Sequence, residues 1–287
     1  MKRNLQLDFL RFWGIILVMI HHVTFFNTSL VGGFFQIVQR GGWIGVDLFF
    51  VLSGYLVSGL IIKEYKVYNS FNAKTFLIRR GFKIYPAFYL FLFYQFFFNL
   101  FLTKHPQSVS GLFHEAIFVG NYFSSNNAHI WSICVEEHFY ILLSLFFLFL
   151  IKYKKVNLNA VCYTYVILLL IGIAFRLNNY LSYSDFDFKR DYARSHFRFD
   201  GLFFGVLLSY ITHYRADILD KLLNNPFKKL LLIFCALFLI SNFVFDRETH
   251  RLESVINLAI NPICFGYIMI NLINFNNASF LKIISPF

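Results

Sequence analysis

The stretch that decides the fold class is "LDFLRFWGIILVMIHHV", residues 7–23, which combines a membrane-length apolar run with four titratable side chains. Similar apolar runs recur along the chain, which is 58% hydrophobic and only 14% charged. This composition predicts a polytopic membrane protein and excludes an ordinary soluble domain. The runs do not alternate with the period of a strand, so we expect an all-α transmembrane helix bundle and not a β-barrel.

Eight spans are expected, with the N-terminus in the cytoplasm, because most lysines and arginines then fall in the inner segments. The spans cover about residues 9–26, 44–62, 84–102, 131–151, 158–175, 199–214, 230–245 and 254–273. The basic segment 63–83 is too charged to span and is expected along the inner membrane face. The net charge of +11 is explained by cytoplasmic segments and anionic lipid, so the lipid bilayer, and no nucleic acid, is the expected partner.

Polar side chains within the spans fall into two groups near opposite membrane faces. On the first helix Arg11 and His22 share a face, about 16 Å apart along the axis, whereas His21 points elsewhere. Asp8 precedes Arg11 by three residues, the spacing of a local ion pair. The outer group comprises His22, Asp47, Trp131, Ser132, Glu136, Glu137, Arg198 and Asp200, and the inner group comprises Asp8, Arg11, Arg79, Arg80 and Lys83. Charges at membrane depth face a cavity or one another, so we expect a path or pocket through the bundle.

The two groups suit different steps of a transfer reaction. A histidine near a carboxylate is the arrangement of a general base that removes a proton from a hydroxyl. Guanidinium and ammonium groups bind phosphoryl oxygens, so the inner group suits a phosphate-bearing donor.

Structural explanations stay open for the same residues. His22 is also compatible with packing, Asp47 with a helix start, and Arg198 with an ion pair to Asp200. The loop 176–198 holds five basic residues on the expected outer side, which suits either an anionic ligand or simple solvation. The GxxxG spacing in "GGWIG" and "GLFFG" indicates close helix packing. We expect no metal site, because the histidines lack ligand spacing.

Five stretches in this order resemble the acyltransferase 3 family of integral membrane acyltransferases. They are "LDFLRFWGIILVMIHHV", "GVDLFFVLSGYLV", "RRGFKIYPAFY", "WSICVEEHFYIL" and "RFDGLFFG". The resemblance implies transfer of an acyl group, commonly acetyl from acetyl-CoA, to a hydroxyl of a cell-envelope or exported carbohydrate, such as a polysaccharide or lipopolysaccharide. It also implies a multi-pass protein of the bacterial inner (cytoplasmic) membrane.

The resemblance assigns roles to individual residues. The family's Arg-x10-His motif falls on Arg11 and His22, and its basic motif falls on Arg80 and Lys83, where the lysine lacks the bidentate fork of an arginine. The implied catalytic residues are His22, as general base, and Glu136. The implied substrate- and donor-binding residues are Arg11, Arg80, Lys83, Asp47, Trp131, Ser132, Glu137, Arg198 and Asp200.

The resemblance spans about residues 5–210, and the whole chain, 1–287, is expected to form one acyltransferase domain. Family members usually have about ten spans and a late segment that this chain lacks, so a C-terminally truncated product is expected. Acyl-CoA is the expected co-substrate, and no permanently bound cofactor is expected. The alternative function is a transporter or exporter with an intramembrane His/Glu/Arg relay.

Overall fold

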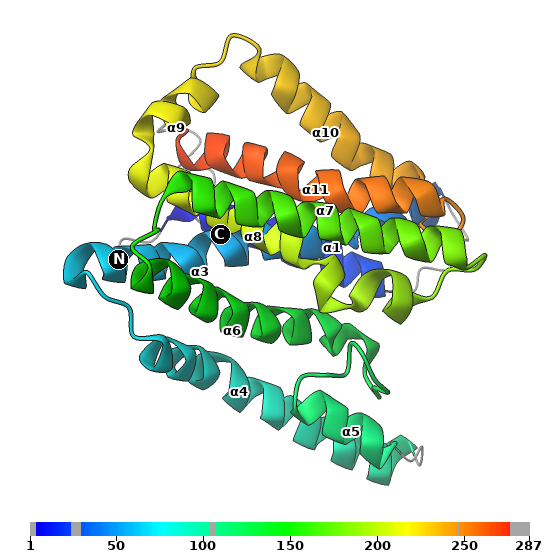
Figure 1. Ribbon diagram of the computed structural model, residues 1–287. Helices are drawn as coiled ribbons and strands as arrows, with labels where there is room; N and C mark the ends of the chain where they lie inside the picture. The colour runs from blue at the N-terminus through cyan, green and yellow to red at the C-terminus, as the bar shows by residue number, and fades with distance from the viewer. Residues whose placement is uncertain (1–3, 24–29, 104–106, 246, 276–287) are drawn as a thin grey trace.

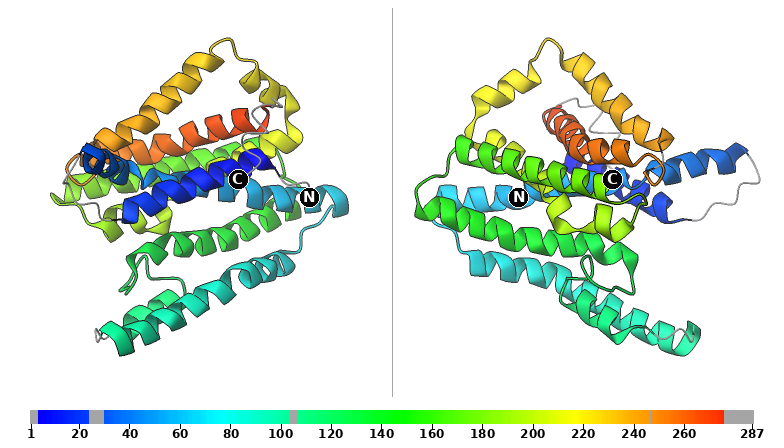
Figure 2. Two further views of the ribbon diagram at one scale, coloured as in Figure 1. Left: turned by 180° about the vertical axis from the view of Figure 1, so that it is seen from behind. Right: turned by 45° about the vertical axis from the view of Figure 1, so that its right-hand side comes forward.

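The computed structural model describes residues 4–23, 30–103, 107–245 and 247–275, and within these ranges the chain is helical, with no strand. The α-helices are α1 (Leu5–His22), α2 (Leu30–Gly41), α3 (Ile44–Tyr68), α4 (Ala73–Phe98), α5 (Val109–Ala116), α6 (Trp131–Lys152), α7 (Leu158–Ser182), α8 (Phe199–Tyr214), α9 (Ala216–Leu223), α10 (Lys228–Val244) and α11 (Arg251–Ile273). Short helical turns cover Asn99–Thr103, Ala128–Ile130, Lys189–Ala193 and Ser195–Phe197. The long helices run side by side, with α4 and α5 along one edge and α10 along the other (Figures 1 and 2).

Each of the eight expected spans overlies a helix, namely α1, α3, α4, α6, α7, α8, α10 and α11. Five helices are long and apolar enough to cross a membrane, or six if the α9–α10 pair, bent by 80°, counts as one broken span. Helix α8 is short, at 16 residues, and α1 carries Asp8 and two histidines among its apolar residues. Several apolar helices thus indicate a multi-pass membrane protein. The count of eight and the side of the N-terminus stay predictions.

Segment 63–83 is divided between the end of α3, a short turn and the start of α4, and its expected place along the inner membrane face stays a prediction. Helix α3 continues to Tyr68, a short turn follows, and α4 begins at Ala73. Asn72 caps α4 by accepting a hydrogen bond from the Thr75 amide at 2.9 Å. Helix α4 then continues unbroken past the basic residues. Their charge does not prevent a long helix, because they lie near its end and long side chains can extend toward the membrane surface.

Helices α3 and α8 approach closely because two glycines meet at their crossing. A Cβ atom on Gly54 would lie 1.9 Å from the Leu202 carbonyl oxygen, and one on Gly205 would lie 2.3 Å from the Val51 carbonyl oxygen. Only a residue without a side chain allows the two backbones this approach. The close packing predicted from "GLFFG" is therefore confirmed for Gly205.

Candidate active site

A small cavity, of about 160 Å³, lies where α1 ends and α3 and α6 begin. We call it the histidine pocket. It is lined by Val18, His21, His22, Trp43, Val46, Ala128, His129, Trp131, Phe188, Tyr192 and Arg247. The cavity therefore brings together two of the predicted site residues, His22 and Trp131, which lie on different helices.

His21 and His22 both line the pocket but differ in their contacts. His21 Nδ1 lies 2.7 Å from the Gln39 carbonyl oxygen, so that nitrogen carries the proton and Nε2 is left as the acceptor. His22 is exposed, and its ring centre lies 5.2 Å from that of His21 and 5.8 Å from that of His129. In the part of the chain that the structure describes, no carboxylate forms an ion pair with His22 and no group of three side chains is placed to bind a metal ion.

Glu136 belongs to a second polar cluster, deeper in the bundle. The Tyr140 hydroxyl donates a hydrogen bond to Glu136 Oε2 at 2.5 Å. Ser53 Oγ lies 3.5 Å from the same carboxylate oxygen and 3.3 Å from the Tyr140 hydroxyl. The Arg80 guanidinium lies 5.7 Å from the centre of the Tyr140 ring. Glu136 lies five residues, about 7.5 Å, along α6 from Trp131 and does not line the histidine pocket, so its catalytic role stays a prediction.

Glu137, the next residue on α6, has a different hydrogen-bond partner from Glu136. The Tyr85 hydroxyl of α4 donates a hydrogen bond to Glu137 Oε2 at 3.0 Å, while Glu137 Oε1 is buried without a hydrogen-bond partner. Ser132 is half-buried in the first turn of α6 and does not line the histidine pocket. The predicted group Trp131, Ser132, Glu136 and Glu137 is therefore divided among different surroundings.

Basic residues line a larger groove of about 670 Å³ between α3 and α4. We call it the basic groove. Its lining residues are Leu60, Glu64, Tyr68, Asn72, Thr75, Phe76, Arg79, Arg80 and Lys83. The groove is therefore lined by Arg79, Arg80 and Lys83 of α4, three members of the predicted inner group. Arg11 lines neither cavity and pairs with Asp8 at 2.6 Å, as its spacing predicted.

Residues on one face of α3 border both cavities. Val46 lines the histidine pocket, Ser53 bonds to the Glu136 cluster, and Leu60 and Glu64 line the basic groove. These positions are spaced by seven, seven and four residues, which places them on one side of an α-helix. The helical rise puts Val46 and Glu64 about 27 Å apart, close to the thickness of a membrane core. A continuous polar path between the two cavities stays a prediction.

Two buried ion pairs hold the helices around this path. Arg198 donates a hydrogen bond to Asp47 Oδ1, and the side-chain amide of Asn261 donates to Asp47 Oδ2 at 3.0 Å. Arg176 pairs with Asp200 at 2.6 Å. The possible Arg198–Asp200 pair is therefore corrected, because each residue has a different partner. Asp47, Arg198 and Asp200 thus join helices α3, α7, α8 and α11 behind the pocket.

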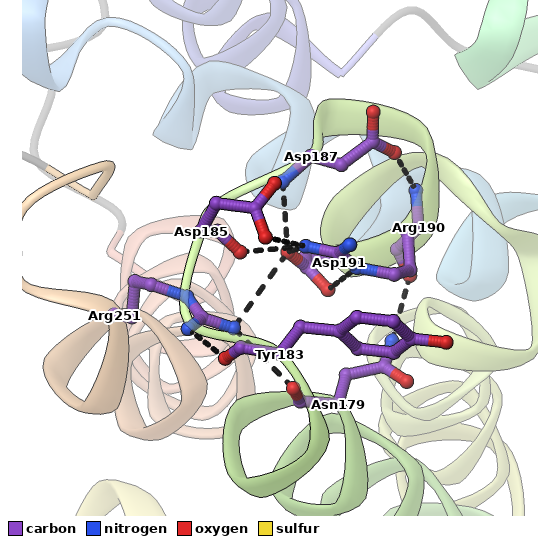
Figure 3. Close-up of polar contacts among 7 residues, drawn as sticks. All are labelled: Asn179, Tyr183, Asp185, Asp187, Arg190, Asp191 and Arg251. Carbon is purple, nitrogen blue, oxygen red and sulfur yellow. Dashed lines mark hydrogen bonds and ion pairs between the residues drawn. The ribbon is translucent and has the colours of Figure 1, made fainter.

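Arg190 of the basic loop after α7 is paired with acidic residues of the same loop. Arg190 donates hydrogen bonds to both Asp191 carboxylate oxygens at 3.0 Å and to the Asp185 carbonyl oxygen at 2.6 Å (Figure 3). The hydrogen bonds from its guanidinium to Asp191 raise the pKa of Arg190 further. Arg251 of α11 lies 3.9 Å from the same Asp191 carboxylate. Neither simple solvation nor an anionic ligand is needed to explain Arg190.

Sequence reasoning missed three residues of the histidine pocket, Trp43, Tyr192 and Arg247. The Arg247 guanidinium lies 5.8 Å from the Trp43 ring centre and 4.6 Å from that of Tyr192. The two rings are 5.7 Å apart and nearly perpendicular. Burial raises the pKa of Tyr192 to about 12, so its hydroxyl is protonated at neutral pH. The polar groups were found by looking for charged and polar side chains in the expected spans. Trp43, Tyr192 and Arg247 lie outside those spans, so this search could not find them.

The chain is similar to several curated O-acetyltransferases. The peptidoglycan O-acetyltransferase OatA of Listeria monocytogenes is 30% identical over 52% of this chain and 25% of its own length. The O-acetyltransferase OatA of Staphylococcus aureus is 28% identical over 71% of this chain and 34% of its own length. The chain thus spans about a quarter to a third of these curated relatives.

The putative peptidoglycan O-acetyltransferase YrhL of Bacillus subtilis is 32% identical over 49% of this chain and 23% of its own length. No solved structure matches the chain significantly. The profile of the acyltransferase 3 family, described as an acyltransferase domain, matches residues 4–287. The helical bundle, its paired cavities and this match over nearly the full sequence lead to one conclusion: the chain belongs to the acyltransferase 3 family.

Proposed function

We propose that this protein is a membrane-bound O-acyltransferase that moves an acetyl group from acetyl-CoA to a hydroxyl of a cell-envelope carbohydrate. The observation that carries the proposal is that the basic groove and the histidine pocket both border one face of α3. Acetylation of a cell-wall polymer fits the family and the names of the relatives. The bacterial inner membrane is the proposed location.

The basic groove is the proposed entrance for the donor. Arg79, Arg80 and Lys83 offer cations to the phosphates of CoA, and the groove is large enough for a sizeable ligand. The acyl-bearing arm of CoA would then extend along α3 past Ser53 and Tyr140. Glu136 accepts hydrogen bonds from both hydroxyls and so orients them along this route. This gives Glu136 a role in positioning the donor arm instead of orienting His22.

The histidine pocket is the proposed site of acyl transfer. His22 is the proposed general base: it accepts the proton of the acceptor hydroxyl as the hydroxyl oxygen attacks the thioester carbonyl. His21, whose Nδ1 is held by the Gln39 carbonyl, presents its Nε2 in the same pocket. His22 is exposed at the end of α1, which leaves it accessible to an acceptor as bulky as a polysaccharide. Trp131 provides an apolar wall against which an acyl group can pack.

Transfer of radiolabelled acetyl from acetyl-CoA into envelope glycan tests the proposal. Membranes with the wild-type chain are compared with membranes containing His22→Ala at equal protein level. His114→Ala is the matched control, because His114 contacts Ser124 outside both cavities. We expect His22→Ala to lose about 10²-fold or more of the rate and the control to keep it. Equal labelling in all three preparations would contradict His22 as the base.

The same membrane preparations distinguish the transporter alternative from the acyltransferase. A transporter would couple the movement of a solute to a proton gradient and would form no covalent product. Acetylated glycan whose formation requires both this chain and acetyl-CoA therefore excludes transport as the sole function. Absence of any labelled product with the wild-type chain would contradict the acyltransferase proposal.

A further inference from the structure

Three residues that line the histidine pocket each have a buried polar atom without a hydrogen-bond partner. These atoms are the indole nitrogen of Trp43, the hydroxyl of Tyr192 and Nη1 of Arg247, judged against all residues that the structure describes. All three side chains line the cavity, and each lies within 6 Å of the other two, as measured between ring centres and the guanidinium carbon. Arg247 acts on the Tyr192 hydroxyl electrostatically but makes no hydrogen bond of normal geometry with it.

Such atoms are rare and need an explanation. Most buried polar groups in proteins form hydrogen bonds, because an unpaired group loses its hydration without compensation. Trp43 is only 3% exposed and Tyr192 only 2% exposed, so solvent does not provide the missing partner. The three residues come from separate parts of the chain: the start of α3, the turn Lys189–Ala193 and the connection before α11. Their convergence on one cavity therefore points to a ligand.

The chemistry of the three groups defines that ligand. Indole and guanidinium groups only donate hydrogen bonds, and the Tyr192 hydroxyl is free to donate. The ligand atom must therefore be an acceptor, and the Arg247 charge favours a negative one. The cavity of about 160 Å³ is smaller than the 300–1,000 Å³ typical of sites that enclose a whole small molecule. The cavity therefore fits the few reacting atoms of an acyl group better than it fits a whole sugar ring that carries a carboxylate.

We propose that Trp43, Tyr192 and Arg247 form an oxyanion hole for acyl transfer, an inference that rests on the proposed function. The acceptor oxygen bonds to the carbonyl carbon of the acyl thioester as its proton passes to His22. The carbonyl π electrons move to the oxygen, and the three donors stabilise this oxyanion. When the carbonyl re-forms, the carbon–sulfur bond breaks, and the thiolate leaves and takes up the proton. Donors that are unpaired beforehand have no hydrogen bond to break when the charge appears.

Steady-state kinetics with purified full-length chain test the oxyanion hole. Radiolabelled acetyl-CoA is the varied donor and isolated envelope glycan the acceptor. Tyr192→Phe removes one oxygen that has no hydrogen-bond partner, and Arg247→Gln removes the charge. We expect each change to lower kcat on the order of 10²-fold, while KM for acetyl-CoA changes by less than about threefold. Trp43→Phe should act in the same direction.

Matched controls exclude a general effect of the substitutions. Tyr267→Phe removes another buried hydroxyl without a partner, on α11 and outside the pocket. Arg40→Gln removes an exposed arginine that contacts the Val244 carbonyl oxygen. Both controls should keep wild-type kcat, and all variants should elute and unfold thermally like the wild type.

The possible outcomes separate the two proposals. A wild-type chain that transfers acetyl while Tyr192→Phe and Arg247→Gln keep full kcat would overturn the oxyanion hole and leave the proposed function standing. A raised KM with unchanged kcat would also overturn it, because that result shows ground-state binding. A folded wild-type chain that transfers no acetyl would contradict the proposed function itself.

Discussion

The crossing of α3 and α8 predicts that Gly54→Ala is strongly destabilising, although alanine is the better helix former. A Cβ on Gly54 would lie 1.9 Å from the Leu202 carbonyl oxygen and 3.2 Å from the Gly205 Cα. Ordinary contact between nonbonded heavy atoms begins near 3.5 Å, so the two helices must separate by about 1.5 Å. The obstacle is backbone in a helix, which cannot rotate away as a side chain can.

Two opposing free-energy terms decide whether Gly54→Ala stabilises or destabilises the protein. Alanine gains about 1 kcal/mol over glycine in helix propensity. Overpacking costs about 1–3 kcal/mol when side chains can adjust, and a gap of 1 Å already forfeits up to half of the dispersion energy at each contact. Separation would also stretch the buried pair between Asp47 of α3 and Arg198 at the start of α8. The packing cost therefore wins, and we expect a net loss of about 2 kcal/mol or more in stability.

Thermal unfolding of detergent-purified protein, followed by loss of the monodisperse elution peak, measures this effect. The expected loss of stability corresponds to a Tm lower by roughly 5 °C or more. Gly59→Ala is the matched control on the same helix, because its added Cβ would meet the Ser209 Oγ at 3.2 Å and the His213 Cε1 at 3.5 Å, both in side chains that can move. The control should match the wild type or exceed it. Equal Tm values for the two variants would refute the argument from backbone contact.

Two further predictions concern the buried pair and the basic groove. Asp47→Ala leaves the Arg198 guanidinium buried without its carboxylate and should cost about 3–5 kcal/mol in thermal or denaturant unfolding. Asp217→Ala, which breaks an exposed pair with Arg215, is the control, and a similar loss in both variants would argue against a special role for the buried pair. Arg80→Gln should raise KM for acetyl-CoA roughly tenfold with a smaller change in kcat, because one charge-assisted phosphate contact is lost. Lys152→Gln, outside the groove, should leave KM unchanged, and an unchanged KM in Arg80→Gln would exclude the groove as the donor site.

Local patterns in the sequence were sufficient for the helices and for short-range contacts. Long apolar runs predicted eight helical segments, and a helix lies at each of them, because a backbone in lipid must bond within its own segment. The pairing of Asp8 with Arg11 followed from a spacing of three residues. The turn at 69–72 was missed, since charge near a helix end was interpreted as a separate surface segment.

The partners of the buried charges could not be predicted, because they depend on which helices pack together. Arg198 bonds to a residue 151 positions away, and Asn261 reaches the same Asp47 across 214 positions. At low dielectric each buried charge requires a partner, but the sequence offers several of suitable type and only the packed arrangement selects one. The bonds of Glu136 to Ser53 and Tyr140 likewise depend on how α3 and α6 pack together.

The candidate site likewise contains residues that local motifs identify and residues that only helix packing brings together. By itself, the sequence determined the fold class, the family resemblance and the residues His22, Trp131, Arg80 and Lys83, because these lie in contiguous motifs. Only the tertiary structure decided that Trp43, Tyr192 and Arg247 meet beside the histidines. Their side chains come from three separate connections, and no local periodicity links positions that become neighbours only when the helices pack.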